Sequence, residues 1–159
     1  MALMSSRPQR EQFVERMGGA LTSAGLARLP SRIFAALLID EDGRMTAAEL
    51  GETLQVSPAA VSGAVRYLDG VGMIRREREG GSRRDIFVVD DDAWHDTLMH
   101  TDQVYAPMLT ALARALEELP ADDPAYRRLR LSQEFLTFIL EEMGILQERW
   151  KQRVKELGL

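Results

Sequence analysis

Residues 46–89 read TAAELGETLQVSPAAVSGAVRYLDGVGMIRREREGGSRRDIFVV, and the organisation of the whole chain follows from this stretch. Residues 46–54 have the pattern of a short amphipathic helix that begins at Thr46, with Glu49 three residues later in a capping box. After the connection at residues 55–56, Ser57 is a good N-cap and Pro58 suits the first helical position. The stretch therefore predicts two helices joined by a tight turn.

The second half of the stretch predicts a β-hairpin. The strand-like pair Met73-Ile74 leads into a charged segment with a Gly-Gly turn at residues 80–81, and residues 86–89 read as a second strand. Helix, turn, helix and a hairpin with a basic tip together form a winged helix-turn-helix. DNA binding is therefore the leading hypothesis.

The helix expected after Ser57 has two different faces. An apolar stripe at spacings of three and four predicts the inward face, formed by Val61, Ala64, Val65 and Leu68. The outward face carries small or polar side chains, namely Ala59, Ala60, Ser62, Gly63, Arg66 and Tyr67. Small residues let a helix lie deep in a major groove. No Glu or Lys occurs from residue 57 to residue 68, which favours contact with a polyanion.

The distribution of charge bears on nucleic-acid binding more than its total does. The whole chain has a formal net charge of −5, yet residues 1–89 carry 12 Arg against 11 acidic residues, and residues 90–159 carry 8 basic against 14 acidic residues. Residues 75–84 contain five Arg and two Glu. DNA binding needs a local positive footprint and not a positive total. The alternative is that these arginines form only a solvated, salt-bridged loop.

The expected contacts divide by role. Phosphate contacts are predicted from polar and basic side chains, which are Ser57, Ser62, Arg75, Arg76 and Arg78. Base readout is predicted from the outward helix face, at Ala59, Ala60, Ser62, Gly63 and Arg66.

The N-terminal flank predicts two helices. Residues 1–7 are expected to be frayed, and residues 9–24 form a helix with Phe13, Met17 and Leu21 on one stripe. The glycine pair at residues 18–19 suits a close approach by another helix, and Gly25 suits a C-cap. Residues 31–39 predict a short, very apolar helix that ends at a polar turn.

The C-terminal flank predicts two long helices. The first covers residues 93–119, with a kink or break near residues 103–106 because Pro107 follows. The second covers residues 124–156 and spans ~45 Å at about 1.5 Å per residue. Its near-heptad stripe, Leu136, Ile139, Met143, Leu146 and Trp150, is expected at a dimer interface with Phe13, Met17 and Leu21. An intramolecular bundle is the alternative.

Several classes of function find no support in the sequence. The chain has no Cys, which excludes disulfides and thiolate sites, and it contains no nucleotide-binding or nucleophile motif. His95 and His100 are five residues apart, which is not the spacing of a metal pair on a helix. No apolar run is long enough to span a membrane, and the N-terminus lacks a signal-peptide core. We expect a cytoplasmic protein that is not an enzyme and holds no cofactor or metal.

Residues 46–78, followed by GGSRRDIF at residues 80–87, resemble the MarR family of transcriptional regulators. The layout of helices over nearly the whole chain agrees with this resemblance. The segment MGGALTSAGLARLPSRIFAALL at residues 17–38 resembles an actinobacterial MarR-type subgroup that includes repressors of efflux-pump genes, with some kinship to GbsR-like proteins.

The resemblance implies a mostly α fold with a small β-hairpin: a winged helix-turn-helix flanked by N- and C-terminal dimerisation helices. It implies a homodimer on a palindromic operator, with residues 57–67 in the major groove and Ser82, Arg83 and Arg84 at the wing tip, reaching the minor groove. Many members release DNA when a small aromatic or lipophilic ligand binds. For such an effector we expect apolar residues where helices meet, although the same residues suit a core or dimer interface: Phe13, Met17, Phe34, Trp94, Leu98 and Tyr105.

Two positions depart from the family pattern. Ser82 occupies the place where members commonly carry the Asp of an Asp-x-Arg signature, which puts the wing-anchoring salt bridge of the family in question. Gln55 occupies a turn position that often holds Gly, while Gly51 fits the small-residue position where the two helices cross.

The expected division is a dimerisation helix at residues 1–28, a winged helix-turn-helix at residues 29–91 and a helical dimerisation region at residues 92–159. The alternative function is a winged helix that binds another protein through its acidic long helices and does not bind DNA. Such a protein would show no salt-dependent affinity for a duplex.

Overall fold

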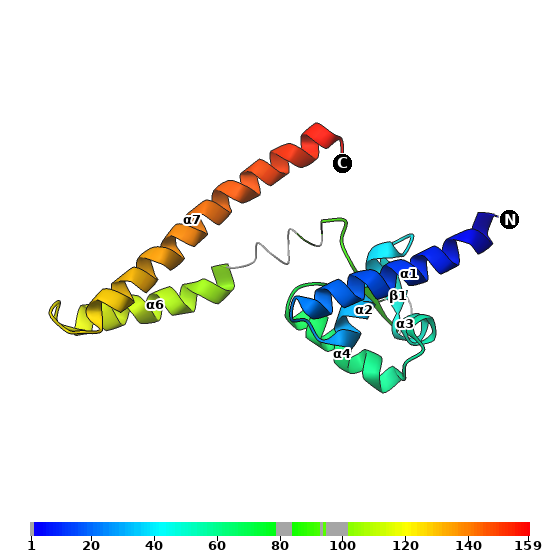
Figure 1. Cartoon of the computed structure of the whole chain (residues 1–159), viewed down its shortest axis with the longest axis horizontal. Helices are drawn as coiled ribbons and strands as arrows, with labels where there is room; N and C mark the ends of the chain where they lie inside the picture. Colours follow the sequence, from blue (N-terminus) through cyan, green and yellow to red (C-terminus); the bar gives the residue numbers. More distant parts are fainter. Residues whose placement is uncertain (1, 79–83, 93, 95–101) are drawn as a thin grey trace. The chain divides into compact units, whose positions relative to one another are not determined.

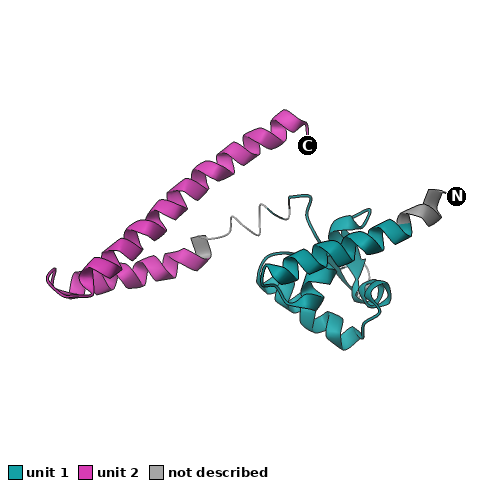
Figure 2. Ribbon diagram, viewed as in Figure 1, with its two compact units in different colours: residues 1–97 teal, residues 98–159 magenta. Residues whose placement is uncertain are grey.

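The computed structural model describes residues 2–78, 84–92, 94 and 102–159. The chain forms two compact units, residues 1–97 and residues 98–159, which are coloured separately in Figure 2. The unit boundary lies a few residues beyond the expected end of the winged domain at residue 91, and the first helix belongs to the same unit as that domain. The three-part division of the chain remains a prediction.

The elements follow the expected order. Unit 1 contains α1 (Ala2–Ser23), α2 (Arg28–Ile39), β1 (Arg44–Thr46), α3 (Ala47–Leu54), α4 (Pro58–Gly70), β2 (Arg75–Arg78) and β3 (Asp85–Val88). Unit 2 contains α6 (Asp102–Glu118) and α7 (Tyr126–Leu157) (Figure 1). The predicted fold class, mostly helical with a small antiparallel sheet in a winged helix-turn-helix, is confirmed.

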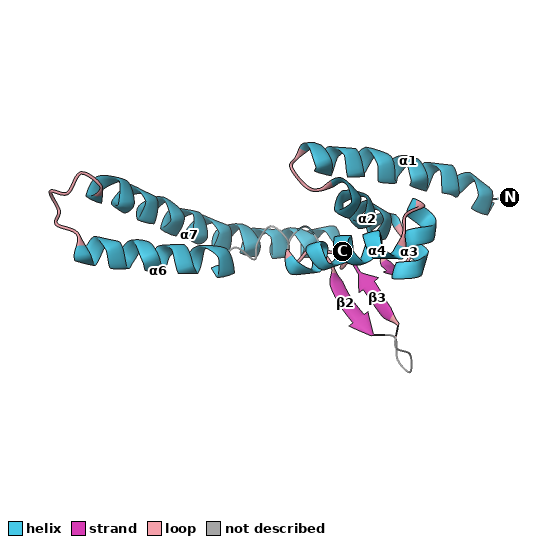
Figure 3. Ribbon diagram, turned by 90° about the horizontal axis from the view of Figure 1, so that it is seen from below, coloured by secondary structure: helices cyan, strands magenta, loops and turns pink. Residues whose placement is uncertain are grey.

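The sheet has three strands in the order β1-β3-β2, all antiparallel. The wing strands β2 and β3 lie side by side (Figure 3), with Arg75 opposite Val88 and Arg78 opposite Asp85. The strand β1 pairs with the other edge of β3, placing Thr46 opposite Ile86. The strand β1 was not predicted, because a three-residue strand with one charged side chain has no readable alternation.

The core of unit 1 surrounds α2. Ile33, Phe34 and Leu37 are completely buried, as expected from the apolar run at residues 31–39. The predicted inward stripe of α4 is also buried, including Val61 and Leu68, which have no exposed surface. Each such side chain contributes about 1.5–3 kcal/mol relative to an exposed one. Since α4 packs on α2, this burial fixes which face of α4 points outward.

The predicted helix ends are confirmed. The Thr46 hydroxyl accepts a hydrogen bond from the Glu49 amide at 3.2 Å, and the Thr46 amide donates to a Glu49 carboxylate oxygen at 2.7 Å. The Ser57 hydroxyl accepts from the Ala60 amide, with proline at the first position of α4. Gln55 adopts the left-handed conformation, with φ 55°, in the turn position that often holds Gly. At Gly51 an added Cβ would lie 3.1 Å from the backbone carbonyl oxygen of Val56.

Glycines also serve the contact between α1 and α2. A Cβ at Gly18 would lie 3.0 Å from Cγ of Arg32, so the close helix approach expected there is confirmed. Gly25 has φ 106°, and its amide bonds to the Thr22 carbonyl while the Leu26 amide bonds to the Leu21 carbonyl. This is the double hydrogen bond of a Schellman cap, so the C-cap prediction is confirmed as well.

Four predicted boundaries were wrong. The helix α1 begins at Ala2 instead of following a frayed segment, and α2 begins at Arg28 because Pro30 lies in its first turn, where an amide donor is not needed. Met73 and Ile74 are buried but precede β2, which starts at Arg75. The break predicted before Pro107 is absent from α6, which continues through that residue, since a proline removes one hydrogen bond without always ending a helix; the alternative, a kink, stays a prediction.

Unit 2 is a pair of packed helices, α6 and α7. None of the residues of α7 is buried, although the helix is 32 residues long. The start predicted for the preceding helix, near residue 93, lies outside the described residues. Among the described helices, none is long and apolar enough to cross a membrane.

Gly43 offers a test of the junction between β1 and β3. It has φ 62°, and an added Cβ would lie 2.9 Å from the Val89 carbonyl oxygen. We expect Gly43→Ala to lower the free energy of unfolding by about 1–3 kcal/mol, measured by urea denaturation. The control is Gly19→Ala in α1, where an added Cβ meets nothing within 4 Å. That variant should gain about 0.5–1 kcal/mol; equal effects at both positions would contradict this description.

Candidate nucleic-acid interface

The outward face of α4 is open to solvent in unit 1. Ser62, Gly63, Arg66 and Tyr67 are exposed, together with Ala59, while Ala60 is half-buried. These six residues are the ones predicted from the spacing of the buried stripe, and the structure brings them together on one helix face. The guanidinium Nε of Arg66 lies 3.4 Å from the Ser62 carbonyl oxygen, so this side chain runs back along the helix.

A groove separates α4 from the wing. It has a volume of about 460 Å³ and is lined by Thr46, Ala47, Ala48, Ser62, Val65, Arg66, Asp69, Arg76, Arg84, Asp85 and Phe87. Three elements therefore meet there: the N-terminal end of α3, the outward face of α4 and the wing strands. Three arginines and two aspartates line it, which gives the groove a positive balance.

Arg84 lies at the wing side of this groove and is exposed. Hydrogen bonds from the backbone and hydroxyl of Thr46 lower the pKa of Glu49, and the positive charge of Arg84 acts in the same direction. Arg84 thus lies near the N-terminal end of α3. Arg78 is exposed as well, whereas Ser82 and Arg83, predicted at the wing tip, lie outside the described residues.

Arg76 joins the two wing strands. Its Nη2 donates to an Asp85 oxygen at 2.5 Å, and this hydrogen bond lowers the pKa of Asp85. Asp85 follows Arg84 directly, at the start of β3. The wing therefore holds an arginine–aspartate anchor, although Ser82 replaces the Asp of the usual signature.

Arg75 is also bound to carboxylates. Its Nε and Nη2 donate to the two oxygens of Asp90 at 2.7 and 2.5 Å, and its Nη1 donates to Glu77 at 2.7 Å. The hydrogen bond from Arg75 lowers the pKa of Asp90. Arg75 and Arg76 were predicted to contact phosphate. The pair of Arg75 with Asp90 was not predicted, because Asp90 is 15 residues away in the chain.

Comparison with known proteins agrees with this geometry. A family model described as the MarR family matches residues 24–85, and one described as MmpR5-like MarR family transcriptional regulator matches residues 92–153. The HTH-type transcriptional regulator MmpR5 of Mycobacterium tuberculosis (strain ATCC 25618 / H37Rv) is 31% identical over 157 residues, which are 96% of this chain and 93% of that protein. The chain belongs to the MarR family of transcriptional regulators.

A solved structure supports the same fold for this MarR-family chain. A crystal structure described as a transcriptional regulator superimposes with a TM-score of 0.77 at 28% identity, covering 91% of this chain and 99% of that chain. The resemblance to the MarR family is thereby confirmed, while the subgroup stays a prediction. As a member of a family of transcriptional regulators, the protein is a DNA-binding regulator and not an enzyme.

The N-terminal residues predicted at a dimer interface lie against the core of this MarR-family chain. Leu21 is 8% exposed and belongs to the core of unit 1, and Phe13 and Met17 pack against that core. Their place in a dimer interface stays a prediction.

The residues predicted to bind an effector are divided between the two units. Phe34 is completely buried, and its ring meets Trp94 edge-on at 5.2 Å between centroids. Tyr105 is on α6, and Leu98 lies outside the described residues. A groove of about 520 Å³ between α1, α2 and the helix-turn-helix turn is lined by none of the six. Effector binding at these residues stays a prediction.

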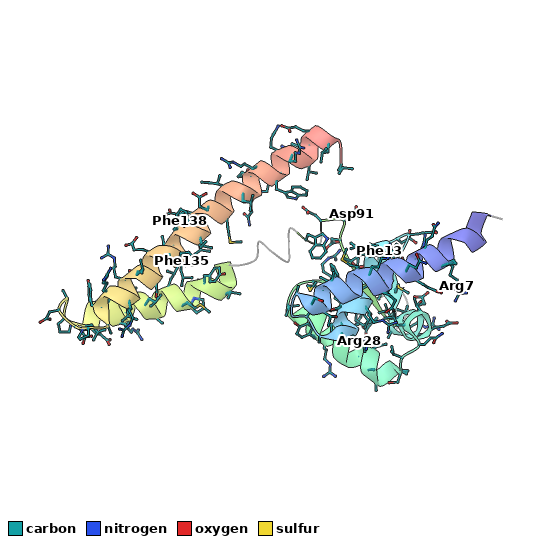
Figure 4. All side chains as sticks on the ribbon, in the orientation of Figure 1. Arg7, Phe13, Arg28, Asp91, Phe135 and Phe138 are labelled. Carbon is teal, nitrogen blue, oxygen red and sulfur yellow. The ribbon has the colours of Figure 1, made fainter. Side chains whose placement is uncertain are left out.

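The C-terminal helix α7 carries an exposed apolar face, which the sequence predicts in part because Phe135, Phe138 and Ile145 widen its apolar stripe. Leu131, Phe135, Phe138 and Ile145 are 68%, 57%, 55% and 46% exposed. Figure 4 labels Phe135 and Phe138 on this helix. The spacing of the four exposed side chains, by four, three and seven residues, places them on one side of α7. Leu136 and Met143, named in the near-heptad stripe, are half-buried and lie on the side of α7 away from this face. The signal was visible in the sequence as a second stripe.

A substitution at Gly63 is expected to change the stability of the fold and the affinity for DNA in opposite directions. An added Cβ there meets nothing within 4 Å, so Gly63→Ala should raise the free energy of unfolding by about 0.5–1 kcal/mol. The same methyl group should obstruct close approach to a groove and weaken DNA binding roughly tenfold, or about 1.4 kcal/mol. Fluorescence anisotropy with the protein's own promoter DNA measures the second effect.

The matched control is Gly70→Ala, two turns further along α4, where an added Cβ also meets open space. It should leave the affinity for DNA unchanged. If Gly63→Ala binds DNA as the wild type does, this part of α4 does not enter a groove.

Proposed function

We propose that this MarR-family protein is a homodimeric repressor that binds a palindromic operator in the cytoplasm. Each α4 enters a major groove through its exposed small-residue face, and each wing reaches the neighbouring minor groove. The observation that carries this proposal is the outward face of α4, which combines exposed Ser62, Gly63 and Arg66 with a groove shared with Arg84. Small side chains permit close approach, and arginines neutralise phosphates.

The N-cap residue supports the same orientation. The Ser57 hydroxyl accepts from the Ala60 amide at 3.3 Å, which leaves its own hydrogen available for donation to a phosphate oxygen. The amides at the beginning of α4 point the same way, and a helix N-terminus favours an anion. Ser57, with these amides, would hold the DNA backbone while Arg66 reads bases.

The low burial of the helices in unit 2 is a second argument for the proposed dimer. An isolated pair of helices with no buried residue on the longer one cannot supply enough apolar burial for a stable fold. One side of α7 carries half-buried Leu129, Leu136 and Leu140, and the other side carries exposed Phe135 and Phe138. A second copy of the chain would cover this outer face and double the DNA-reading units.

Repression released by a small lipophilic or aromatic ligand completes the proposal. It rests on what the resemblance to the MarR family implies, since many members release DNA when such a ligand binds. The regulated genes are proposed to include efflux functions, as in the subgroup that residues 17–38 resemble.

Two arginine variants test the DNA-reading assignment. Arg84→Ala should weaken binding to the promoter and reduce the slope of log affinity against log salt by about 0.9, because one phosphate contact is lost. Arg66→Ala should cost about 1–3 kcal/mol and relax specificity at one base pair. Arg127→Ala, an exposed arginine on α7, makes the same charge change away from the reading surface and serves as control. Wild-type gel shifts from both test variants would show the assignment to be wrong.

A charge on the outer face of α7 tests the dimer. Phe138→Asp should convert the protein from a dimer to a monomer of 17.9 kDa in sedimentation velocity, because an unpaired carboxylate would be buried in the interface. Thr137→Asp places the same charge on an exposed position beside this face and should leave the dimer intact. A wild-type protein that sediments as a monomer, or a Phe138→Asp variant that remains a dimer, would contradict the proposal.

A further inference from the structure

Four charged side chains connect the three strands of the sheet, and we call them the sheet clasp: Arg44, Arg75, Glu77 and Asp90. Arg44 on β1 donates from Nη2 to a Glu77 oxygen at 3.1 Å, although β3 lies between their strands. Glu77 also accepts from Arg75 at 2.7 Å. Arg75 in turn forms a two-point contact with Asp90, two residues after the end of β3.

All three nitrogens of the Arg75 guanidinium point at carboxylates. Nε and Nη2 bind Asp90, and Nη1 binds Glu77. The two arginines and two carboxylates of the clasp sum to zero charge. A phosphate would have to displace a bidentate carboxylate to reach Arg75, and planar two-point pairs of this kind are among the stronger hydrogen-bonded contacts. Arg75 is therefore poorly suited to the phosphate contact that the sequence suggested.

The position of the clasp gives it another role. Arg75 begins β2 and lies opposite Val88 near the end of β3, so the clasp lies at the base of the wing. Arg78 and Arg84 lie at the other end of the two strands, toward the tip. A hairpin of two short strands is marginally stable alone. The direction in which the wing points is consequently set at its base. Arg75 connects that base to Asp90, in the segment that follows β3.

We propose that Arg75 is a positioning residue for DNA binding: bound by Asp90 and Glu77, it fixes the base of the wing so that Arg84 meets the DNA, and it does not itself contact phosphate. The proposal rests on the proposed function. Arg75 and Asp90 are 54% and 39% exposed, and exposed ion pairs contribute little to global stability. Loss of the Arg75–Asp90 pair is therefore expected to change the position of the wing while changing the stability of the fold little.

The variant Asp90→Asn distinguishes a positioning Arg75 from a phosphate-binding Arg75, because the two roles predict opposite changes in the affinity for DNA. The substitution removes a negative charge and frees Arg75, so a phosphate-binding Arg75 would bind DNA as well as before or more tightly. A positioning Arg75 would lose its partner, and affinity should fall about threefold to tenfold. Asp91→Asn removes the same charge from the exposed neighbouring residue and should not weaken binding.

Three further variants complete the measurement, made by fluorescence anisotropy over a range of salt on the full chain and promoter DNA. Arg75→Gln should bind DNA as weakly as Asp90→Asn does. The double variant should bind DNA no more weakly than either single variant, because both substitutions break the same contact. Arg75→Lys should also bind DNA more weakly than the wild type, because a lysine cannot form the two-point contact with Asp90. Melting temperatures should stay within a few degrees of the wild type.

Wild-type or tighter binding by Asp90→Asn, or wild-type affinity in Arg75→Lys, would overturn the inference while leaving the proposed function standing. A drop in affinity matched by a large loss of melting temperature in every clasp variant would also overturn it, since the clasp would then be a stability element. Absence of salt-dependent DNA binding by the wild-type protein would instead overturn the proposed function.

Discussion

The packing of α4 on α2 is the constraint on which the reading surface depends. Val61 and Leu68 are completely buried against a core that contains Phe34, and this burial leaves only one rotation of α4 about its axis. The opposite face is therefore fixed as the exposed one. Its side chains are small or polar, so they contribute little to folding and are free to serve recognition. Stability and recognition are thus divided between two faces of one helix.

The charges of the chain are also distributed unevenly. A chain with a formal net charge of −5 still presents arginines around one groove, while most of its acidic excess lies after residue 89. Within the wing, carboxylates hold some arginines to the protein: Asp85 binds Arg76, and Asp90 binds Arg75. Arg76 and Arg84 both line the groove, and Arg76 also binds Asp85 within the wing. A count of basic residues does not reveal these pairs.

The sequence predicted the elements whose cause is local and missed those whose cause lies elsewhere in the chain. The Thr46–Glu49 capping box, the Ser57 cap and the buried stripe of α4 follow from spacing alone. The strand β1 exists because β3 offers it an edge, and the partners of Arg75 come from 2 and 15 residues away. The exposed face of α7 was readable as a stripe, but its importance depends on the finding that α6 covers the other side.

The proposed dimer would read DNA twice, because one α4 presents a single arginine and a few small side chains to a groove. Selection of binding sites from random duplex DNA by the full-length protein tests that claim most directly. The account predicts an enriched inverted repeat whose half-sites are centred about 10 base pairs apart or a multiple of that distance. Enrichment of a single unrepeated site, or of no sequence at all, would contradict it.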